Sequence, residues 1–240
     1  MPALCRNQPC SQKDMLKPPS SAKARVVIVE DHPMFRERLA HLINKEPDLV
    51  VSGEADNIQD GFDLMVNNGA RVGIVDISLK GSSGLELIKN LKAAGVDTPL
   101  LVLSMHDESL YAERVLRAGA RGYITKHEAS SKIMTALRQV LAGEIYLGTR
   151  VATKILSNLG GRNNPPETGV RRLTDRELEV FEMIGRGRTT REISVSLSLG
   201  AATVETYRAR IKEKLHLENA AQLRHEAIRW VHAAEQTGVR

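Results

Sequence analysis

The feature that most constrains this chain is a series of five short apolar segments, each followed by a stretch with helical periodicity. A segment such as VVIV at 26–29 has no polar face, which is typical of a strand that is buried on both sides. Strands of this kind that alternate with helices predict a doubly wound α/β domain, a parallel sheet covered by helices on both faces. The predicted strands are 25–30, 49–55, 72–76, 100–104 and 122–125, and the predicted helices are 32–44, 58–67, 85–94, 108–118 and 130–141.

The pattern changes at 157–169, a segment rich in glycine, proline and asparagine that indicates a linker. Beyond it only helical periodicity remains, at 174–184, 189–197, 202–215 and 219–234. Thr174 with Glu177, and Thr189 with Glu192, have the spacing of capping boxes that begin helices. We therefore expect a disordered tail at 1–22, the α/β domain at 23–145, a terminal segment and linker at 146–169, and a small all-α domain at 170–235.

Composition narrows the classes of protein further. A formal net charge of +5 favours a polyanionic partner only weakly in a chain of this length. Cys5 and Cys10 lie together in the proline-rich tail, and two cysteines cannot build a disulfide scaffold or a zinc site there. We expect a cytoplasmic protein without membrane contact, because the chain shows neither a long apolar run nor an apolar signal region near its start.

Polar residues follow the predicted strands at their carboxyl ends. Glu30 and Asp31 follow the first strand, Asp76 ends the third, Ser104 ends the fourth, and Lys126 follows the fifth. Because the carboxyl ends of parallel strands meet at one edge of a sheet, we expect these side chains to converge. Neighbouring carboxylates repel one another unless a cation neutralises them, and their oxygens suit Mg²⁺. Such a metal, with the lysine ammonium and the serine hydroxyl, can offset the charge of an incoming phosphoryl group.

Residues 25–143 resemble the receiver domain of two-component response regulators, which has a flavodoxin-like fold. The matching stretches are VVIVEDH at 26–32, IVDISLKGSSGLELI at 74–88, LLVLSMHDE at 100–108 and GARGYITK at 119–126. The resemblance implies that Asp76 accepts a phosphoryl group from a cognate sensor histidine kinase, with Mg²⁺ as cofactor. It assigns Glu30, Asp31, Asp76 and the backbone carbonyl of Ser78 to the metal, Ser104 and Tyr123 to a switch pair, Lys126 to the phosphate, and Ser78 and Met105 to flanking positions.

Residues 171–231 resemble the LuxR-type output domain of the NarL/FixJ family, on LTDRELEVFEMIGRGRTTREISVSLSL at 173–199, TVETYRARIKEKL at 203–215 and ENAAQLRHEAI at 218–228. The resemblance implies a helix-turn-helix whose recognition helix, at 202–215, enters the major groove of duplex DNA. The residues expected to contact DNA are Arg188, Arg191, Thr203, Glu205, Thr206, Arg208, Ala209, Arg210 and Lys212. Ser198 stands where the turn of relatives often has glycine, and Glu205 where many relatives place lysine, so the operator cannot be borrowed from them.

Together these resemblances predict a response regulator in which phosphorylation of Asp76 controls DNA binding and transcription and favours a homodimer. Before phosphorylation, the recognition helix is expected to be partly masked. Tyr123 is expected to swing inward once Ser104 moves toward the phosphate. A haloacid-dehalogenase-like phosphohydrolase needs an acid/base aspartate where this chain has Ser78, so we expect no enzyme and no catalytic residue. The alternative is a receiver whose helical domain binds protein or RNA instead of duplex DNA.

Overall fold

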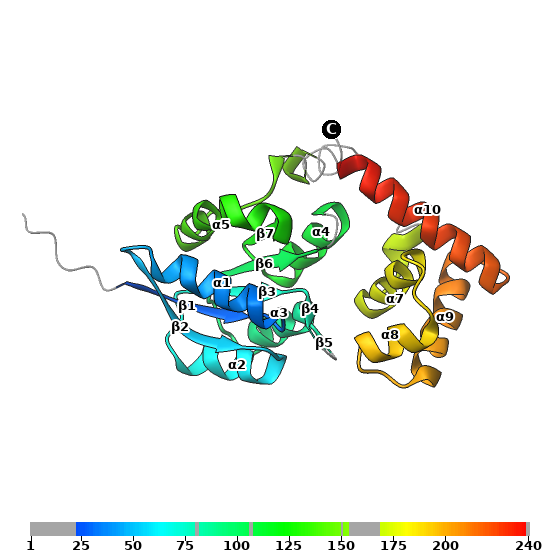
Figure 1. The fold of residues 1–240 in the computed structure, drawn as a ribbon, viewed down its shortest axis with the longest axis horizontal. Coiled ribbons are helices and arrows are strands. Elements are labelled where there is room, and N and C mark those ends of the chain that lie inside the picture. The colour runs from blue at the N-terminus through cyan, green and yellow to red at the C-terminus, as the bar shows by residue number, and fades with distance from the viewer. Residues whose placement is uncertain (1–22, 80–81, 106–107, 150, 154–168, 239–240) are drawn as a thin grey trace, which may run out of the picture.

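The computed structural model describes residues 23–79, 82–105, 108–149, 151–153 and 169–238. They form two parts: an α/β unit up to residue 153 and a helical unit from residue 169 (Figure 1). The predicted tail at 1–22 and nearly all of the predicted linker at 157–169 lie outside the described residues. Within the described residues, no helix is both long and apolar enough to cross a bilayer.

A five-stranded sheet of order β2-β1-β3-β6-β7 forms the centre of the α/β unit, and every neighbouring pair is parallel. Its strands are β1 (Ala24–Val29), β2 (Leu49–Ala55), β3 (Val72–Asp76), β6 (Leu100–Ser104) and β7 (Gly122–Thr125). The register pairs Asp76 with Leu103, and Ser104 with Thr125. The carboxyl ends of β3, β6 and β7 therefore meet at one edge, as predicted.

Helices cover both faces of the sheet, which confirms the predicted doubly wound architecture. On one face lie α1 (Pro33–Asn44) and α5 (Lys126–Leu141), and on the other lie α2 (Ile58–Asn67), α3 (Gly84–Ala93) and α4 (Glu108–Ala118). Within β1, Val26 and Ile28 pack toward the first pair of helices, whereas Val27 and Val29 pack toward the other three. This alternation explains the continuous apolar strands, because each side chain finds a helix on its own side.

Apart from shifts of one residue at the ends of other elements, two features of the α/β unit differ from the prediction. Helix α5 begins at Lys126 instead of residue 130, because the Thr125 side chain caps it by accepting from the backbone N–H of Glu128. A short antiparallel pair, β4 (Ser78–Leu79) and β5 (Ser82–Ser83), follows β3 and was not predicted. Strands of two residues are too short to show any periodicity in the sequence.

The helical unit contains η1 (Gly169–Arg172), α7 (Asp175–Gly185), α8 (Thr190–Ser196), α9 (Ala201–Leu215) and α10 (Ala220–Gly238). Both predicted capping boxes are present, at the starts of α7 and α8. Between α8 and α9, Ser198 adopts a left-handed conformation with φ of 51°. This conformation favours glycine, which is the residue that relatives often have at this turn.

Candidate functional site

An acidic pocket lies at the carboxyl edge of the sheet. Glu30 and Asp31 follow β1, Asp76 ends β3, Ser104 ends β6, and Lys126 begins α5. All five residues are buried, although four of them carry ionisable side chains. Burying several charges is costly unless they are paired or neutralised, so this concentration indicates a functional site instead of ordinary packing.

Lys126 balances only part of the negative charge of the pocket. Its Nζ lies 2.8 Å from Asp76 Oδ2 and 2.7 Å from Glu30 Oε2, and 4.9 Å from the centre of the Phe35 ring. Burial and repulsion from Glu30 raise the pKa of Asp76 above its ordinary value, and the attraction of Lys126 does not outweigh them. Burial lowers the pKa of Lys126, but its two carboxylate partners more than compensate and raise it, so the lysine remains an ammonium.

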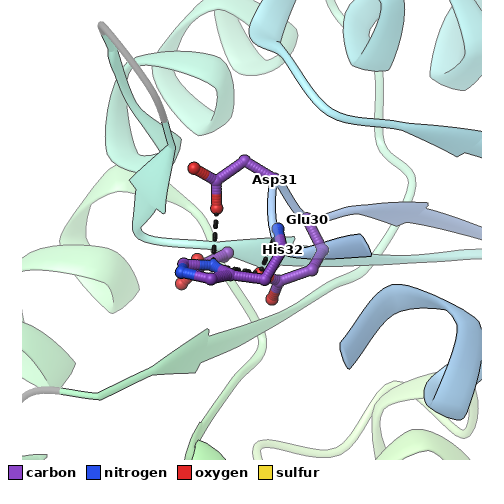
Figure 2. A group of neighbouring side chains, drawn as sticks. Glu30, Asp31 and His32 are labelled. Carbon is purple, nitrogen blue, oxygen red and sulfur yellow. Dashed lines mark hydrogen bonds and ion pairs between the residues drawn. The ribbon is translucent and has the colours of Figure 1, made fainter. Parts of the chain in front are cut away.

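The pocket fits a hard divalent cation. Ligand atoms of Glu30, Asp31, His32 and Asp76 all lie within 4.8 Å of one another. Asp76 Oδ1 is buried and has no hydrogen-bond partner among the described residues, so one carboxylate oxygen is available to a ligand. Figure 2 shows the His32 ring beside Asp31 and Glu30; the Nδ1 of this exposed ring is 2.8 Å from Asp31 Oδ1 and 3.0 Å from Glu30 Oε1. His32 was part of the matched VVIVEDH stretch but was not predicted as a site residue.

The two residues of the expected switch pair lie on neighbouring strands. Ser104 is buried at the end of β6, and Tyr123 on β7 is completely buried. Tyr123 belongs to the same apolar cluster as Tyr111 of α4. Tyr123 therefore does not rest in an outward position in this structure, because α4 packs over this part of the sheet.

Gly84 allows the backbone of β3 to lie close to α3. A Cβ built at this position would lie 1.9 Å from the Asp76 carbonyl oxygen, so no larger residue fits without moving the strand. Ser78, whose carbonyl is expected to bind the metal, lies two residues after Asp76 in β4 with its side chain exposed. Met105, next to Ser104, is also exposed.

The residues expected to contact DNA lie on α9 and around the start of α8. Thr203, Glu205, Thr206, Ala209 and Arg210 are exposed, as are Arg188 and Arg191, whereas Lys212 is partly buried. Val204 and Ile211 are buried on the opposite side of α9 and attach this helix to the rest of the unit. A helix with one packed face and one exposed polar, partly basic face is the shape that major-groove recognition requires.

A small polar network orders part of the α9 surface. Thr190 of α8 donates from its hydroxyl to Glu205 at 2.8 Å and accepts from Arg208 at 3.1 Å. Arg208 Nε also lies 3.7 Å from Glu205 Oε2, and the Arg208 side chain is only 16% exposed. The guanidinium of Arg208 is therefore held in place and partly neutralised by α8 and α9. Thr190 was not predicted, since its two partners are 15 and 18 residues away in the sequence.

The expected masking of the recognition helix is wrong for this structure. The side chain of Glu205 is 59% exposed, and most of its neighbours on α9 are exposed too. The helical unit instead meets the α/β unit through its first helix, α7, which bears polar contacts to α3 and α4. In Figure 1, α7 lies between α9 and the α/β unit.

Two family models match separate parts of the chain. Residues 26–138 match the family model described as the response regulator receiver domain, and residues 171–227 match that of the bacterial regulatory proteins of the luxR family. Among curated relatives, the transcriptional regulatory protein UhpA of Salmonella typhimurium is 35% identical over 200 residues, covering 83% of this chain and 95% of UhpA. The response regulator UvrY of Escherichia coli is 31% identical over 205 residues, covering 85% of this chain and 93% of UvrY.

Solved structures agree with the fold. A LuxR-family two-component response regulator from an Aurantimonas species is 27% identical with a TM-score of 0.54, over 58% of this chain and 100% of that one. RcsB of Salmonella enterica serovar Typhimurium, bound to the promoter rprA, is 23% identical with a TM-score of 0.58, over 85% and 98% of the two chains. The second similarity extends to both units of the chain and concerns the fold alone.

Proposed function

Because the chain belongs to the two-component response regulators that join a receiver domain to a LuxR-type DNA-binding domain, we propose that phosphorylation of Asp76 controls its binding to duplex DNA. Members of this family are transcription regulators and not enzymes, so the phosphohydrolase alternative is set aside. The luxR match also favours DNA over protein or RNA as the ligand of the helical unit. We propose the receiver domain at 23–145, the DNA-binding domain at 170–235 and a connecting segment at 146–169.

The single observation that carries this proposal is the Asp76 carboxyl group. Its Oδ2 is paired with Lys126, while its buried Oδ1 has no hydrogen-bond partner among the described residues. In the proposed reaction, Oδ1 forms a bond to the phosphorus of a phosphohistidine on the sensor kinase. The phosphorus–nitrogen bond breaks, and the imidazole of the kinase keeps the electron pair and takes up a proton. The Lys126 ammonium and the Ser104 hydroxyl then face the new phosphoryl oxygens.

The residues that would hold Mg²⁺ are Glu30, Asp31, Asp76 and the backbone carbonyl of Ser78. When bound, this cation offsets the negative charge shared by the carboxylates and the transferred group. The chain itself contributes the rest: Lys126 orients the acceptor carboxylate, and Gly84 allows α3 to approach it closely. The proposed partners are a cognate histidine kinase, duplex DNA and a second copy of this chain after phosphorylation. The proposed location is the cytoplasm, where the chromosome lies.

Replacing Arg191 or Lys212 by alanine is expected to weaken DNA binding of the full-length protein and to leave phosphate uptake from acetyl phosphate unchanged. Arg191 is exposed on α8 beside the recognition helix, where a phosphate contact would release counterions. For Arg191→Ala, the slope of log affinity against log salt should decrease by about 1, uniformly across DNA sequences. Fluorescence anisotropy at several salt concentrations measures this slope.

The matched control is Arg38→Ala, which removes one positive charge from an exposed position on α1, far from the helical unit in sequence. It should leave both affinity and slope unchanged. If Arg191→Ala and Lys212→Ala bind DNA as the unchanged protein does, the proposed DNA surface is wrong. Binding of RNA in preference to duplex DNA by the unchanged protein would instead support the alternative ligand.

A further inference from the structure

The contact between the two domains is made by an unusual helix. On one side of α7, Leu178 and Phe181 pack inside the DNA-binding domain, as the sequence pattern predicts. On the other side, Glu179 and Glu182 are also buried, at 6% and 3% exposure. A helix face that bears two glutamates is expected to be exposed to solvent. Burying it is costly unless the carboxylates find hydrogen-bond or ion-pair partners. The receiver supplies some of these hydrogen-bond partners.

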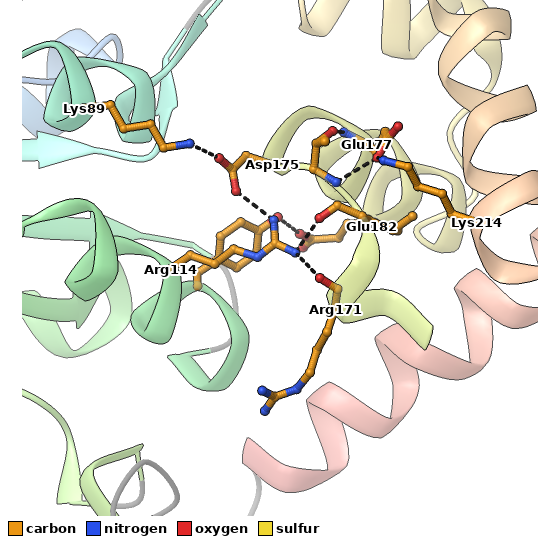
Figure 3. A network of polar contacts seen from close by, with 10 residues as sticks. Lys89, Arg114, Arg171, Asp175, Glu177, Glu182 and Lys214 are labelled. Carbon is orange, nitrogen blue, oxygen red and sulfur yellow. Dashed lines mark hydrogen bonds and ion pairs between the residues drawn. The ribbon is translucent and has the colours of Figure 1, made fainter. Parts of the chain in front are cut away.

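Arg114 of α4 binds the start of the same helix, ahead of the two glutamates in the sequence (Figure 3). Its guanidinium donates to Asp175 Oδ1 at 2.7 Å, to the carbonyl oxygen of Leu173 at 2.7 Å and to that of Arg171 at 3.4 Å. Lys89 of α3 holds the second oxygen of Asp175, also at 2.7 Å. One arginine thus binds a carboxylate and two carbonyl oxygens at the start of α7, and its side chain is only 15% exposed. Such charge-assisted, multiple contacts fix orientation as well as position.

Tyr111 of α4 is a residue of the receiver that pairs with one of the buried glutamates. Its hydroxyl donates to Glu182 Oε2 at 3.1 Å in a buried setting. Burial, with the negative charges of Glu182 and Glu179, raises the pKa of Tyr111 well above its ordinary value. The phenol therefore keeps its proton, which makes it a permanent donor to α7.

Tyr111 also adjoins the switch residue of the receiver. It shares an apolar cluster with Tyr123, and the two phenols lie close enough to influence each other electrostatically. The same cluster continues into the DNA-binding domain through Leu173 and Val180. Tyr111 thus lies near the receiver switch on one side and donates a hydrogen bond to the first helix of the output domain on the other.

We propose that Tyr111 is the positioning residue through which the receiver switch controls the DNA-binding domain. Tyr111 and Arg114, with their contacts to α7 and to the residues just before it, form an interdomain contact that we call the latch. The inference rests on the proposed phosphate switch for its trigger. A shift of Ser104 toward a phosphorylated Asp76 opens space beside the already buried Tyr123, which changes the packing of Tyr123 near Tyr111 and loosens the Tyr111 hydrogen bond to Glu182. Because the α9 surface is exposed while the latch is closed, the latch acts by fixing the orientation of the DNA-binding domain, not by covering its recognition helix. Opening it frees that domain to align with a second copy on DNA.

The test uses full-length Tyr111→Phe and Arg114→Ala in the unphosphorylated state, so the outcome does not depend on phosphotransfer. Tyr111→Phe removes only the hydroxyl, and Arg114→Ala removes the guanidinium. In both, amide hydrogen exchange in α7 should accelerate about 5-fold or more, the lower end of typical allosteric coupling. The DNA probe is a genomic duplex selected by protein treated with acetyl phosphate. The affinity of both variants for this duplex should rise by a comparable factor, and their phosphate uptake should be unchanged.

Arg121→Ala is the matched control, because it removes one arginine side chain at an exposed position of the receiver just after α4. It should exchange and bind DNA as the unchanged protein does. The inference is overturned if unphosphorylated Tyr111→Phe and Arg114→Ala match the unchanged protein in both exchange and DNA affinity. It is also overturned if phosphorylation alters α7 exchange equally in Tyr111→Phe and in the unchanged protein. Failure of Asp76 to take up phosphate would count against the proposed function only, since the latch variants are compared without it.

Discussion

Replacing Asp76 by asparagine is expected to abolish uptake of acid-labile phosphate from acetyl phosphate in the presence of Mg²⁺. Asparagine keeps the size of the side chain but has no nucleophilic carboxylate oxygen at the position of the free Asp76 Oδ1. Asp76 combines a buried oxygen that has no hydrogen-bond partner among the described residues with a 2.8 Å contact to Lys126, and it ends β3, the position that the resemblance assigns to the acceptor. Intact-protein mass spectrometry measures the adduct directly. Asp97→Asn, an exposed change of the same kind, should take up phosphate normally.

The raised pKa of Asp76 predicts that Asp76→Asn stays folded, so a loss of phosphate uptake in this variant reflects the lost nucleophile and not unfolding. A folded-state pKa above the ordinary 3.8 means that the folded protein holds this proton more tightly than the unfolded chain does. The stability that this proton contributes is present below about pH 3.8 and is lost as the pH rises through the raised pKa. At neutral pH the ionised Asp76 therefore costs stability, and Asp76→Asn should unfold at the same or a higher temperature. An Asn variant that still forms the adduct would contradict the assignment of the acceptor.

Replacing Glu30 by glutamine together with Asp31 by asparagine is expected to eliminate Mg²⁺ binding at millimolar concentrations. Both side chains are buried within 4.8 Å of Asp76, and the double change removes two of the three carboxylates of the pocket. In the unchanged protein, Mg²⁺ at 100 times its dissociation constant should raise the free energy of unfolding by about 2.7 kcal/mol. In the double variant this gain should vanish. Calorimetric titration and thermal unfolding with and without Mg²⁺ measure the two effects.

The double variant should remain folded without metal, because removing two negative charges relieves repulsion in the pocket and leaves Lys126 paired with Asp76. The control is Glu37→Gln with Asp63→Asn, which makes the same change of charge at exposed positions on α1 and α2. That control should keep the full Mg²⁺ response. Equal Mg²⁺ affinity in the unchanged protein and the Glu30/Asp31 variant would show that the metal lies elsewhere.

Much of the receiver could be predicted from the sequence because its pattern is repetitive and local. The central residues of the buried strands are apolar, and each acidic or hydroxyl residue of the pocket either ends a strand or follows one within two residues. Parallel pairing then brings Asp76 and Ser104 to the same edge, although 28 positions separate them in the sequence. The capping boxes of α7 and α8 were likewise visible as short local patterns, and the structure confirms them.

What the sequence could not predict depends on contacts between distant residues. Arg114 and Asp175 are 61 positions apart, and Tyr111 and Glu182 are 71 apart. Taken alone, Glu179 and Glu182 suggest a solvent-exposed side of a helix, and only the position of α4 shows that they are buried. The same holds for the recognition helix, which was expected to be partly masked. Only the arrangement of the two domains in the structure shows that it is exposed.

The central claim, that phosphate on Asp76 controls DNA binding, is tested most directly by one affinity measurement. Fluorescence anisotropy compares the full-length protein with and without acetyl phosphate, and Asp76→Asn with acetyl phosphate, on one genomic duplex selected by the phosphorylated protein. Phosphorylation should strengthen binding by about 1–3 kcal/mol, or about 5- to 150-fold, and Asp76→Asn should bind as the unphosphorylated protein does. Equal affinity in all three samples, with the phosphate adduct verified by mass spectrometry in the first, would contradict the account.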